Sequence, residues 1–217
     1  MAHVAMFDLE SVKMKIQKLI AVFALALAPA FASAVPNLVT NGSFEAPNIP
    51  NNSWTIFYGS IPGWSTGPAG VEVRDNNAGT AYDGTQFVEL DTTSNSWIQQ
   101  TLNTVIGESY LISFAYSPRI GVNGTSNKID IWWNGVKLGS ANGSGLNQSN
   151  HTWLIYEFDV VAASSASVLR FAAAGTSDSL GGSLDAISVS LVSEPAMPAL
   201  ILAGLGLVGF AARRRKA

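Results

Sequence analysis

The sequence has 217 residues, 47% of them hydrophobic, and it contains no cysteine, which excludes disulfides, thiolate zinc sites and cysteine nucleophiles. The formal net charge of −3 conceals an uneven distribution, because residues 35–194 hold thirteen Asp and Glu against five Lys and Arg, a net charge of −8. A domain this acidic repels the phosphate backbone of nucleic acids. It is compatible with hard cations and with neutral ligands such as glycans.

Residues 1–34 have the pattern of a secretory signal peptide. Lys15 and Lys18 form a basic segment, residues 19–28 are apolar, and an Ala-x-Ala cleavage site follows at residues 32–34. An amphipathic helix of the fold would need a polar stripe, and the apolar segment lacks one. We therefore predict that this signal helix is removed and that the mature chain begins at Val35.

Residues 35–192 contain many short apolar runs, separated by turn signals such as Asn-Gly, Asp-Gly and Pro-Gly, and no long helical period. The predicted strands are Leu38–Thr40 with Phe44, Trp54–Tyr58, Val71–Val73, Gln86–Leu90, Trp97–Thr101, Tyr110–Tyr116, Lys128–Leu138, Trp153–Val160, Ser167–Phe171 and Ser183–Val192. This succession of short strands predicts a single all-β sandwich.

The segment Asp83–Asp91 combines an Asp-Gly turn signal with a run of alternating residues. Glu89 and Asp91 are two positions apart, so they stand side by side on one face of the predicted strand. The mixed polarity of this face predicts a half-buried strand with one face partly exposed to solvent. Two interpretations stay open: a strand that is entered from a tight turn, or two carboxylates that border a ligand or a cation.

Alternation along residues 128–133 separates an apolar face from a polar one. The apolar face carries Ile129, Ile131 and Trp133, and the other face carries Lys128, Asp130 and Trp132. An exposed indole beside hydrogen-bonding groups suits a sugar ring, because the C–H faces of the sugar pack on the aromatic plane and its hydroxyls need polar partners. We therefore predict Trp132, Asp130 and Lys128 as ligand-binding residues. The alternative is an indole that a neighbouring loop covers.

The order of several motifs resembles that of DUF642-type domains. The motifs are Asn37–Glu45, Ile61–Trp64, Val71–Val73, Asp83–Asp91, Gln100–Thr101, Gly107 with Tyr110, Ser113–Phe114, Arg119, Trp133–Gly135 and Leu184–Asp185. That family belongs with the galactose-binding-like jelly rolls and is similar to the carbohydrate-binding modules that open on Asn-Gly-x-Phe-Glu. The resemblance spans nearly all of residues 35–192 and implies a jelly-roll β-sandwich with a binding function. The cysteines common in plant members are absent here, so their disulfide is not implied.

The same resemblance implies a structural calcium site. The similar carbohydrate-binding modules often hold calcium where the first and last strands run near each other, and Glu45 and Asp185 lie at the corresponding positions here. Calcium takes several oxygen ligands with negative charge among them, and the backbone carbonyl of Ser43 would add one oxygen. The alternative is that both carboxylates cap turns by accepting hydrogen bonds from backbone N–H groups.

Residues 193–217 resemble the PEP-CTERM sorting signal of Gram-negative bacteria. An apolar run at residues 196–212 is just long enough to cross a bilayer core of roughly 30 Å at about 1.5 Å per residue, and a basic cluster follows it. The resemblance implies export across the inner membrane and handling by the membrane protease exosortase, although Ser193 replaces the usual first proline. The residues of the signal are Glu194, Pro195, Arg213, Arg214 and Arg215. The alternative is a plain C-terminal transmembrane anchor.

The sequence shows no complete catalytic constellation. His151 lies in an Asn-rich loop without a Gly-x-Ser-x-Gly elbow, and the spacing of the acidic residues does not select a glycosidase pair. We therefore predict a secreted, surface-sorted, non-catalytic protein that binds extracellular polysaccharide. The alternatives are a structural or adhesive matrix protein without a small ligand and, less favoured by these residues, a glycoside hydrolase.

Overall fold

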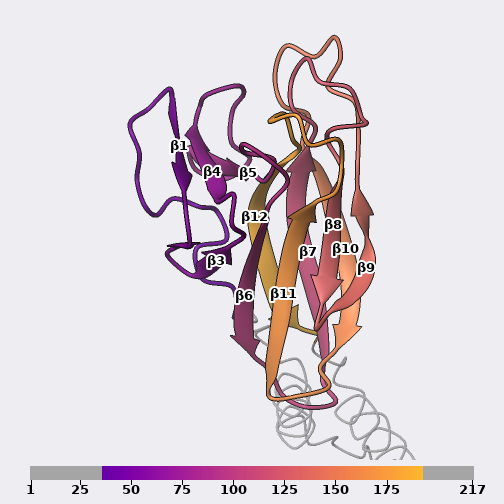
Figure 1. Ribbon diagram of the computed structural model, residues 1–217. Helices are drawn as coiled ribbons and strands as arrows, with labels where there is room; N and C mark the ends of the chain where they lie inside the picture. The colour runs from indigo at the N-terminus through magenta and orange to yellow at the C-terminus, as the bar shows by residue number, and fades with distance from the viewer. Residues whose placement is uncertain (1–35, 193–217) are drawn as a thin grey trace, which may run out of the picture. The chain divides into compact units, whose positions relative to one another are not determined.

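The computed structural model describes residues 36–192, and these residues form two antiparallel sheets that pack face to face (Figure 1). The first sheet contains β1 (Ser53–Phe57), β4 (Val71–Asp75), β5 (Gln86–Glu89), β12 (Ser183–Leu191), β7 (Ser109–Ser117) and β10 (Leu154–Val161), in that spatial order. The second sheet contains β2 (Ser60–Ile61), β3 (Trp64–Thr66), β6 (Trp97–Asn103), β11 (Ala166–Ala173), β8 (Ile129–Trp133) and β9 (Val136–Ala141), again in spatial order.

This arrangement confirms the predicted all-β jelly-roll sandwich. The described residues contain no α-helix, and so none that could span a bilayer. The signal helix and the C-terminal transmembrane helix were predicted for segments that lie outside these residues.

The core lies between the inward faces of the two sheets. Alternation places Ile112, Phe114 and Tyr116 of β7 there, all fully buried. Phe114 packs edge-on against Phe171 of the opposite sheet, with ring centroids 4.9 Å apart. Phe171 also packs edge-on against Trp64, with ring centroids 6.4 Å apart. Aromatic side chains therefore join the two layers, as the apolar period of the sequence implies.

The predicted run at residues 128–138 is a hairpin of β8 and β9. Asn134 and Gly135 form its turn with φ values of 49° and 78°, the left-handed conformation that favours Asn-Gly at this position. The strand predicted at residues 38–40 is absent. The amide of Leu38 does bond to the carbonyl oxygen of Val189 at 2.8 Å, but the next amide turns to the side chain of Asn37 at 3.0 Å, which interrupts the ladder.

The prediction that the strand at residues 86–90 has a partly wet face was wrong. Glu89 and Asp91 are 1% and 0% exposed, because a loop before β12 covers the outward face of β5. The amide of Gly181 donates to Glu89 Oε1 at 2.8 Å, and the amide of Asp178 donates to Asp91 Oδ2 at 2.9 Å. The two carboxylates do stand on one face, and they fasten this loop to the sheet.

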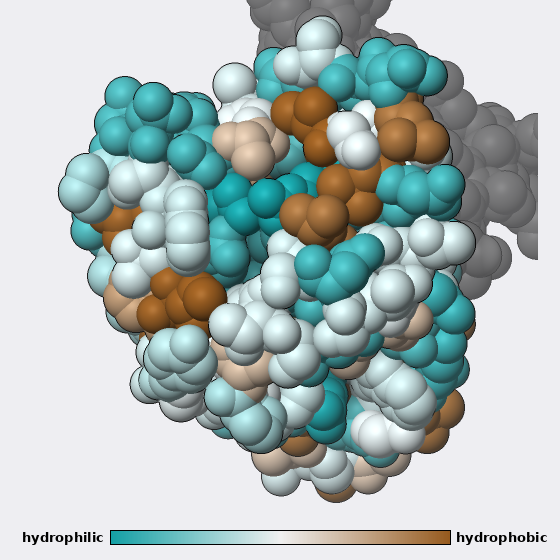
Figure 2. Space-filling model, turned by 45° about the horizontal axis from the view of Figure 1, so that its top comes forward, coloured by the Kyte–Doolittle hydropathy of each residue, from teal (hydrophilic) through white to brown (hydrophobic). Residues whose placement is uncertain are grey.

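One end of the sandwich consists of long loops, and this end is turned forward in Figure 2. The surface there is hollowed, and strongly hydrophilic residues line the hollow between flanking apolar side chains (Figure 2). The loop end is therefore polar, in contrast to the flat faces of the strands.

Candidate functional site

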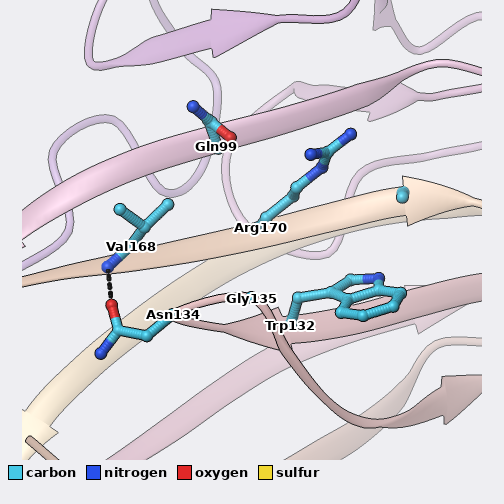
Figure 3. A pocket seen from close by; sticks show the side chains of 7 residues that line it. Gln99, Trp132, Asn134, Gly135, Val168 and Arg170 are labelled. Atoms are coloured by element: carbon cyan, nitrogen blue, oxygen red, sulfur yellow. Dashed lines mark hydrogen bonds between the residues drawn. The ribbon is translucent and has the colours of Figure 1, made fainter. Parts of the chain in front are cut away.

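A groove of about 680 Å³ lies on the outward face of the second sheet (Figure 3). Three adjacent strands build it, because β11 lies between β6 and β8. Arg170 of β11 pairs with Gln99 of β6 on one side and with Trp132 of β8 on the other, so the three side chains share the outward face. The lining residues are Gln99, Trp132, Asn134, Gly135, Val168, Arg170 and Ala172.

Trp132 lies on the wall of this groove, with its ring along β8 (Figure 3). The indole is part-exposed, whereas its neighbour Trp133 is 5% exposed and belongs to the core. The structure therefore places Trp132 on the face that alternation predicted. Its role in ligand binding stays a prediction.

Asp130 and Lys128 lie on the same face as Trp132, but neither lines the groove. Asp130 accepts a hydrogen bond from Ser140 Oγ at 2.6 Å and forms an ion pair with Lys137 Nζ at 2.7 Å, and Lys128 Nζ stands 3.9 Å away. Burial raises the pKa of Asp130, but the hydrogen bonds from Lys137 and Ser140 outweigh it, so that the pKa falls below its ordinary value. Asp130 is thus ionised and already compensated by protein cations.

The sequence analysis missed Arg170 and its surroundings. The guanidinium of Arg170 stacks over the ring of Trp97, 4.2 Å from the centroid. Asn134 closes the end of the groove, because its Oδ1 accepts the amide hydrogen of Val168 at 2.7 Å (Figure 3). Alternation along β11 would have placed Arg170 outward, but only the strand order sets it beside Trp132.

The residues predicted to bind calcium meet on one segment, Tyr82–Gln86. Glu45 Oε1 accepts two consecutive amide hydrogens of this segment, both at 2.8 Å. Asp185 Oδ2 accepts two more, at 2.7 and 3.0 Å. The two carboxylates therefore hold the turn before β5, which is the capping role that the sequence left open.

The surroundings of Asp185 leave room for the calcium hypothesis. Ser43 and Asp83 line a small pocket of about 250 Å³ together with Ala186. Burial raises the pKa of Asp185 to about 7, and the negative charge of Asp83 adds to the rise, so a nearby cation would relieve an unfavourable charge. Within residues 36–192 no three His, Cys, Asp or Glu side chains are grouped to hold a metal, so carbonyls and water would have to complete the shell. Calcium at this position remains a proposal.

Thermal melts with calcium and with a chelator test this proposal. A ligand that binds only the folded state adds about 2.7 kcal/mol at a hundredfold excess over Kd, which raises Tm by roughly 5–10 °C in a domain of this size. We expect such a rise for the wild-type protein and none for Glu45→Gln or Asp185→Asn. Coincident wild-type melts would show that the calcium site does not exist.

A second cluster of charges is buried on the outward face of the first sheet. Arg74 forms ion pairs with Glu72 and, from Nε, with Glu89 Oε2 at 3.2 Å. Arg119 Nη1 lies 2.7 Å from Glu89 Oε1 and also donates to the carbonyl oxygen of Ser179 at 3.2 Å. Burial raises the pKa of Glu89 to about 7, against the opposing charges of Arg74 and Arg119. Both carboxylate oxygens of Glu89 have protein partners. The cluster is therefore structural, and it connects β4 and β5 to two loops.

His151 lies near this cluster and packs edge-on against Phe87 and Trp153, at centroid distances of 4.7 and 4.9 Å. Burial lowers the pKa of His151 to about 4, so the ring is neutral at pH 7. Its Nδ1 is 3.1 Å from the carbonyl oxygen of Thr80, and its Nε2 is 3.4 Å from Ser183 Oγ. A Ser-His-acid triad needs a carboxylate at the position that this carbonyl takes.

The sorting-signal residues Glu194, Pro195, Arg213, Arg214 and Arg215 lie outside the described residues. The sequence profile of the PEP-CTERM protein-sorting motif matches residues 191–216. The chain is therefore an exported protein that carries a cell-surface sorting signal for processing by exosortase. No curated protein sequence matches this chain. The resemblance to DUF642-type domains stays a prediction.

The solved structures that resemble this chain include a cyclase and carbohydrate-binding modules. The cyclase FisC from Fischerella sp. TAU is 15% identical, with a TM-score of 0.54 over 75% of this chain and 100% of its own. TmCBM61, solved with β-1,4-galactotriose, is 17% identical, with a TM-score of 0.46 over 72% of this chain and 99% of its own. A family 35 carbohydrate-binding module from Clostridium thermocellum is 20% identical, with a TM-score of 0.41 over 63% of this chain and 97% of its own. The likeness to the first of these shows the jelly-roll sandwich and no particular activity.

Proposed function

We propose that this protein is a non-catalytic binding protein of the cell surface, and that it binds extracellular polysaccharide in the groove formed by β6, β11 and β8. The observation that carries the proposal is the groove itself. It combines an aromatic plane, Trp132, with polar side chains from the neighbouring strands, Gln99 and Arg170. A sugar ring needs both, because its C–H face packs on an aromatic ring while its hydroxyls seek hydrogen-bond partners.

The position of the groove also suits a polymer. It lies on the outward face of strands rather than in a closed cavity, and two of its lining residues are small, Ala172 and Gly135. An open groove accepts an internal segment of a long chain, whereas a closed cavity accepts only a chain end. The occupant that fits is therefore a polysaccharide held along the sheet.

The charges around the groove support binding without catalysis. A glycoside hydrolase uses two carboxyl groups that flank the scissile bond, and among residues 36–192 no carboxylate lines this groove. The nearest carboxylate on this face within residues 36–192, Asp130, is already held by Lys137 and Ser140. The neutral, part-buried His151 lies in the loop before β10, packs against Phe87 of the first sheet, and has a backbone carbonyl as the partner of Nδ1.

Replacing Trp132 with alanine tests the proposal. Truncation of an anchoring aromatic at a binding site commonly costs about 2 kcal/mol, which is roughly thirtyfold in affinity. We expect Trp132→Ala to weaken retention of the full-length protein on polysaccharide affinity gels about thirtyfold, with Tm nearly unchanged because the ring is part-exposed.

Trp133→Ala is the matched control, because the neighbouring indole points into the core. Its loss should cost about 3–5 kcal/mol of stability, which separates a folding defect from a binding defect. If Trp132→Ala leaves retention unchanged on every gel that retains the wild type, the groove is not the site. If no gel retains the wild type, the structural or adhesive matrix protein becomes the better conclusion.

A further inference from the structure

We propose that the groove is selective for acidic polysaccharides, and that Arg170 binds the carboxylate of a uronic acid whose ring stacks on Trp132. This inference rests on the proposed function and names the substrate class of the same site.

The first observation is that Arg170 differs from the other cations of the domain. Residues 36–192 contain five basic side chains: Arg74, Arg119, Lys128, Lys137 and Arg170. The first four each lie within 4.0 Å of a carboxylate oxygen. Arg170 has no such partner among the described residues, although acidic side chains far outnumber basic ones. Among the described residues, Arg170 is therefore the basic side chain whose charge is left without a carboxylate partner.

The second observation is the state of its guanidinium. Arg170 stacks on Trp97 at 4.2 Å, and this contact fixes the plane of the guanidinium while leaving its N–H edges free. No hydrogen bond joins the Arg170 side chain to another group in the part of the chain that the structure describes, and the side chain lines the groove. A fixed guanidinium with free N–H groups matches the two oxygens of a carboxylate, which it binds in a bidentate manner.

The third observation is the local charge. Gln99 and Trp132, the cross-strand neighbours of Arg170, are both uncharged. Asp130, the acidic residue closest to the groove on this face, is compensated by Lys137 and Lys128. The groove is therefore a positive site on an acidic domain. Such a site favours an anionic ligand over a neutral one, whereas the rest of the surface repels polyanions.

Trp132 and Arg170 are directly paired across β8 and β11, so the two side chains start about 4.5–5.5 Å apart at Cβ. From there the guanidinium of Arg170 extends towards β6, where it stacks on Trp97 (Figure 3). A uronic acid that stacks on the indole would therefore lie across β11, with its carboxylate directed at the guanidinium.

The experiment compares matched ligands on the full-length protein in detergent micelles. The probes are polygalacturonate, alginate and hyaluronan, each beside its carboxyl-reduced form, at physiological ionic strength. We expect at least one acidic polymer to bind at least tenfold more tightly than its reduced form, a difference of about 1.4 kcal/mol. Arg170→Gln should abolish this difference without weakening the reduced polymer. Arg170→Lys should keep part of it, because lysine retains the charge but not the bidentate geometry.

The two proposals fail in different ways. If reduced and acidic forms bind equally well to the wild type, or if Arg170→Gln binds both as the wild type does, the selectivity is refuted and polysaccharide binding stands. If no polymer of either form binds, the proposed function is refuted and the selectivity with it. Equal melting temperatures of the wild type and both Arg170 variants establish that the comparison concerns folded protein.

Discussion

Glu89→Ala is expected to lower the free energy of unfolding by about 3–5 kcal/mol, because it removes one partner from a buried ion cluster. Glu89 is 1% exposed and accepts from Arg119 at 2.7 Å and from the amide of Gly181 at 2.8 Å. Without its carboxylate, Arg74 is left buried with Glu72 alone. A domain of this size should lose roughly 10 °C in Tm, measured by calorimetry or circular dichroism.

Glu157→Ala is the matched control for this effect. Glu157 is an exposed residue of β10 and takes part in none of the ion pairs found within residues 36–192, so its loss should change stability by less than about 0.5 kcal/mol. Glu89→Gln can still accept the amide hydrogen of Gly181, so its loss of stability should lie between those of Glu89→Ala and Glu157→Ala. If Glu89→Ala and Glu157→Ala have the same melting temperature, the cluster does not hold the loop to the sheet.

The second large effect is a loss of stability in acid that depends on His151. Burial lowers the pKa of His151 to about 4 from an unfolded value of about 6.5, so the folded protein binds this proton less readily than the unfolded chain does. The stabilisation from neutral His151 is fully present above pH 6.5. It is lost as the pH falls towards 4, by about 3 kcal/mol at most.

The measurement is the difference in unfolding free energy between the wild type and His151→Gln from pH 7.5 to pH 4. The pKa of Glu89 is raised to about 7, so its protonation stabilises the folded state as the pH falls. Glu89 is present in both proteins, so this contribution largely cancels in the difference. Arg74 and Arg119 also lower the pKa of His151, while the carbonyl of Thr80 raises it. We expect the wild type to lose stability relative to the variant as the pH falls. A difference that does not vary with pH would mean that His151 titrates normally in the fold.

The buried ion cluster and the groove lie on different sheets. Glu72, Arg74 and Glu89 lie on the first sheet and His151 packs against it, whereas Trp132 and Arg170 lie on the outward face of the second. Substitutions at Glu89 should therefore change the melting temperature, and substitutions in the groove should change retention on polysaccharide. This separation allows the binding experiments to be interpreted without a folding defect.

The sequence by itself determined the features that depend on neighbours along the chain. Alternation assigned the two faces of residues 128–133, and the Asn134-Gly135 pair marked the hairpin turn, because side-chain direction and turn conformation are local properties. The absence of helical period gave the all-β class. The motif at residues 191–216 is likewise a linear signal and needs no fold to be recognised.

Only the tertiary structure decided which outward faces are covered and which are open. Glu89 and Trp132 both alternate with apolar neighbours, yet a loop from residues 177–182 buries the first, and the second lines a groove. The strand order β6-β11-β8 brings Gln99, Arg170 and Trp132 together from distant parts of the chain. Local sequence cannot encode this, because burial of an outward face depends on packing between segments far apart in the chain, and that packing is fixed only when the whole sandwich closes.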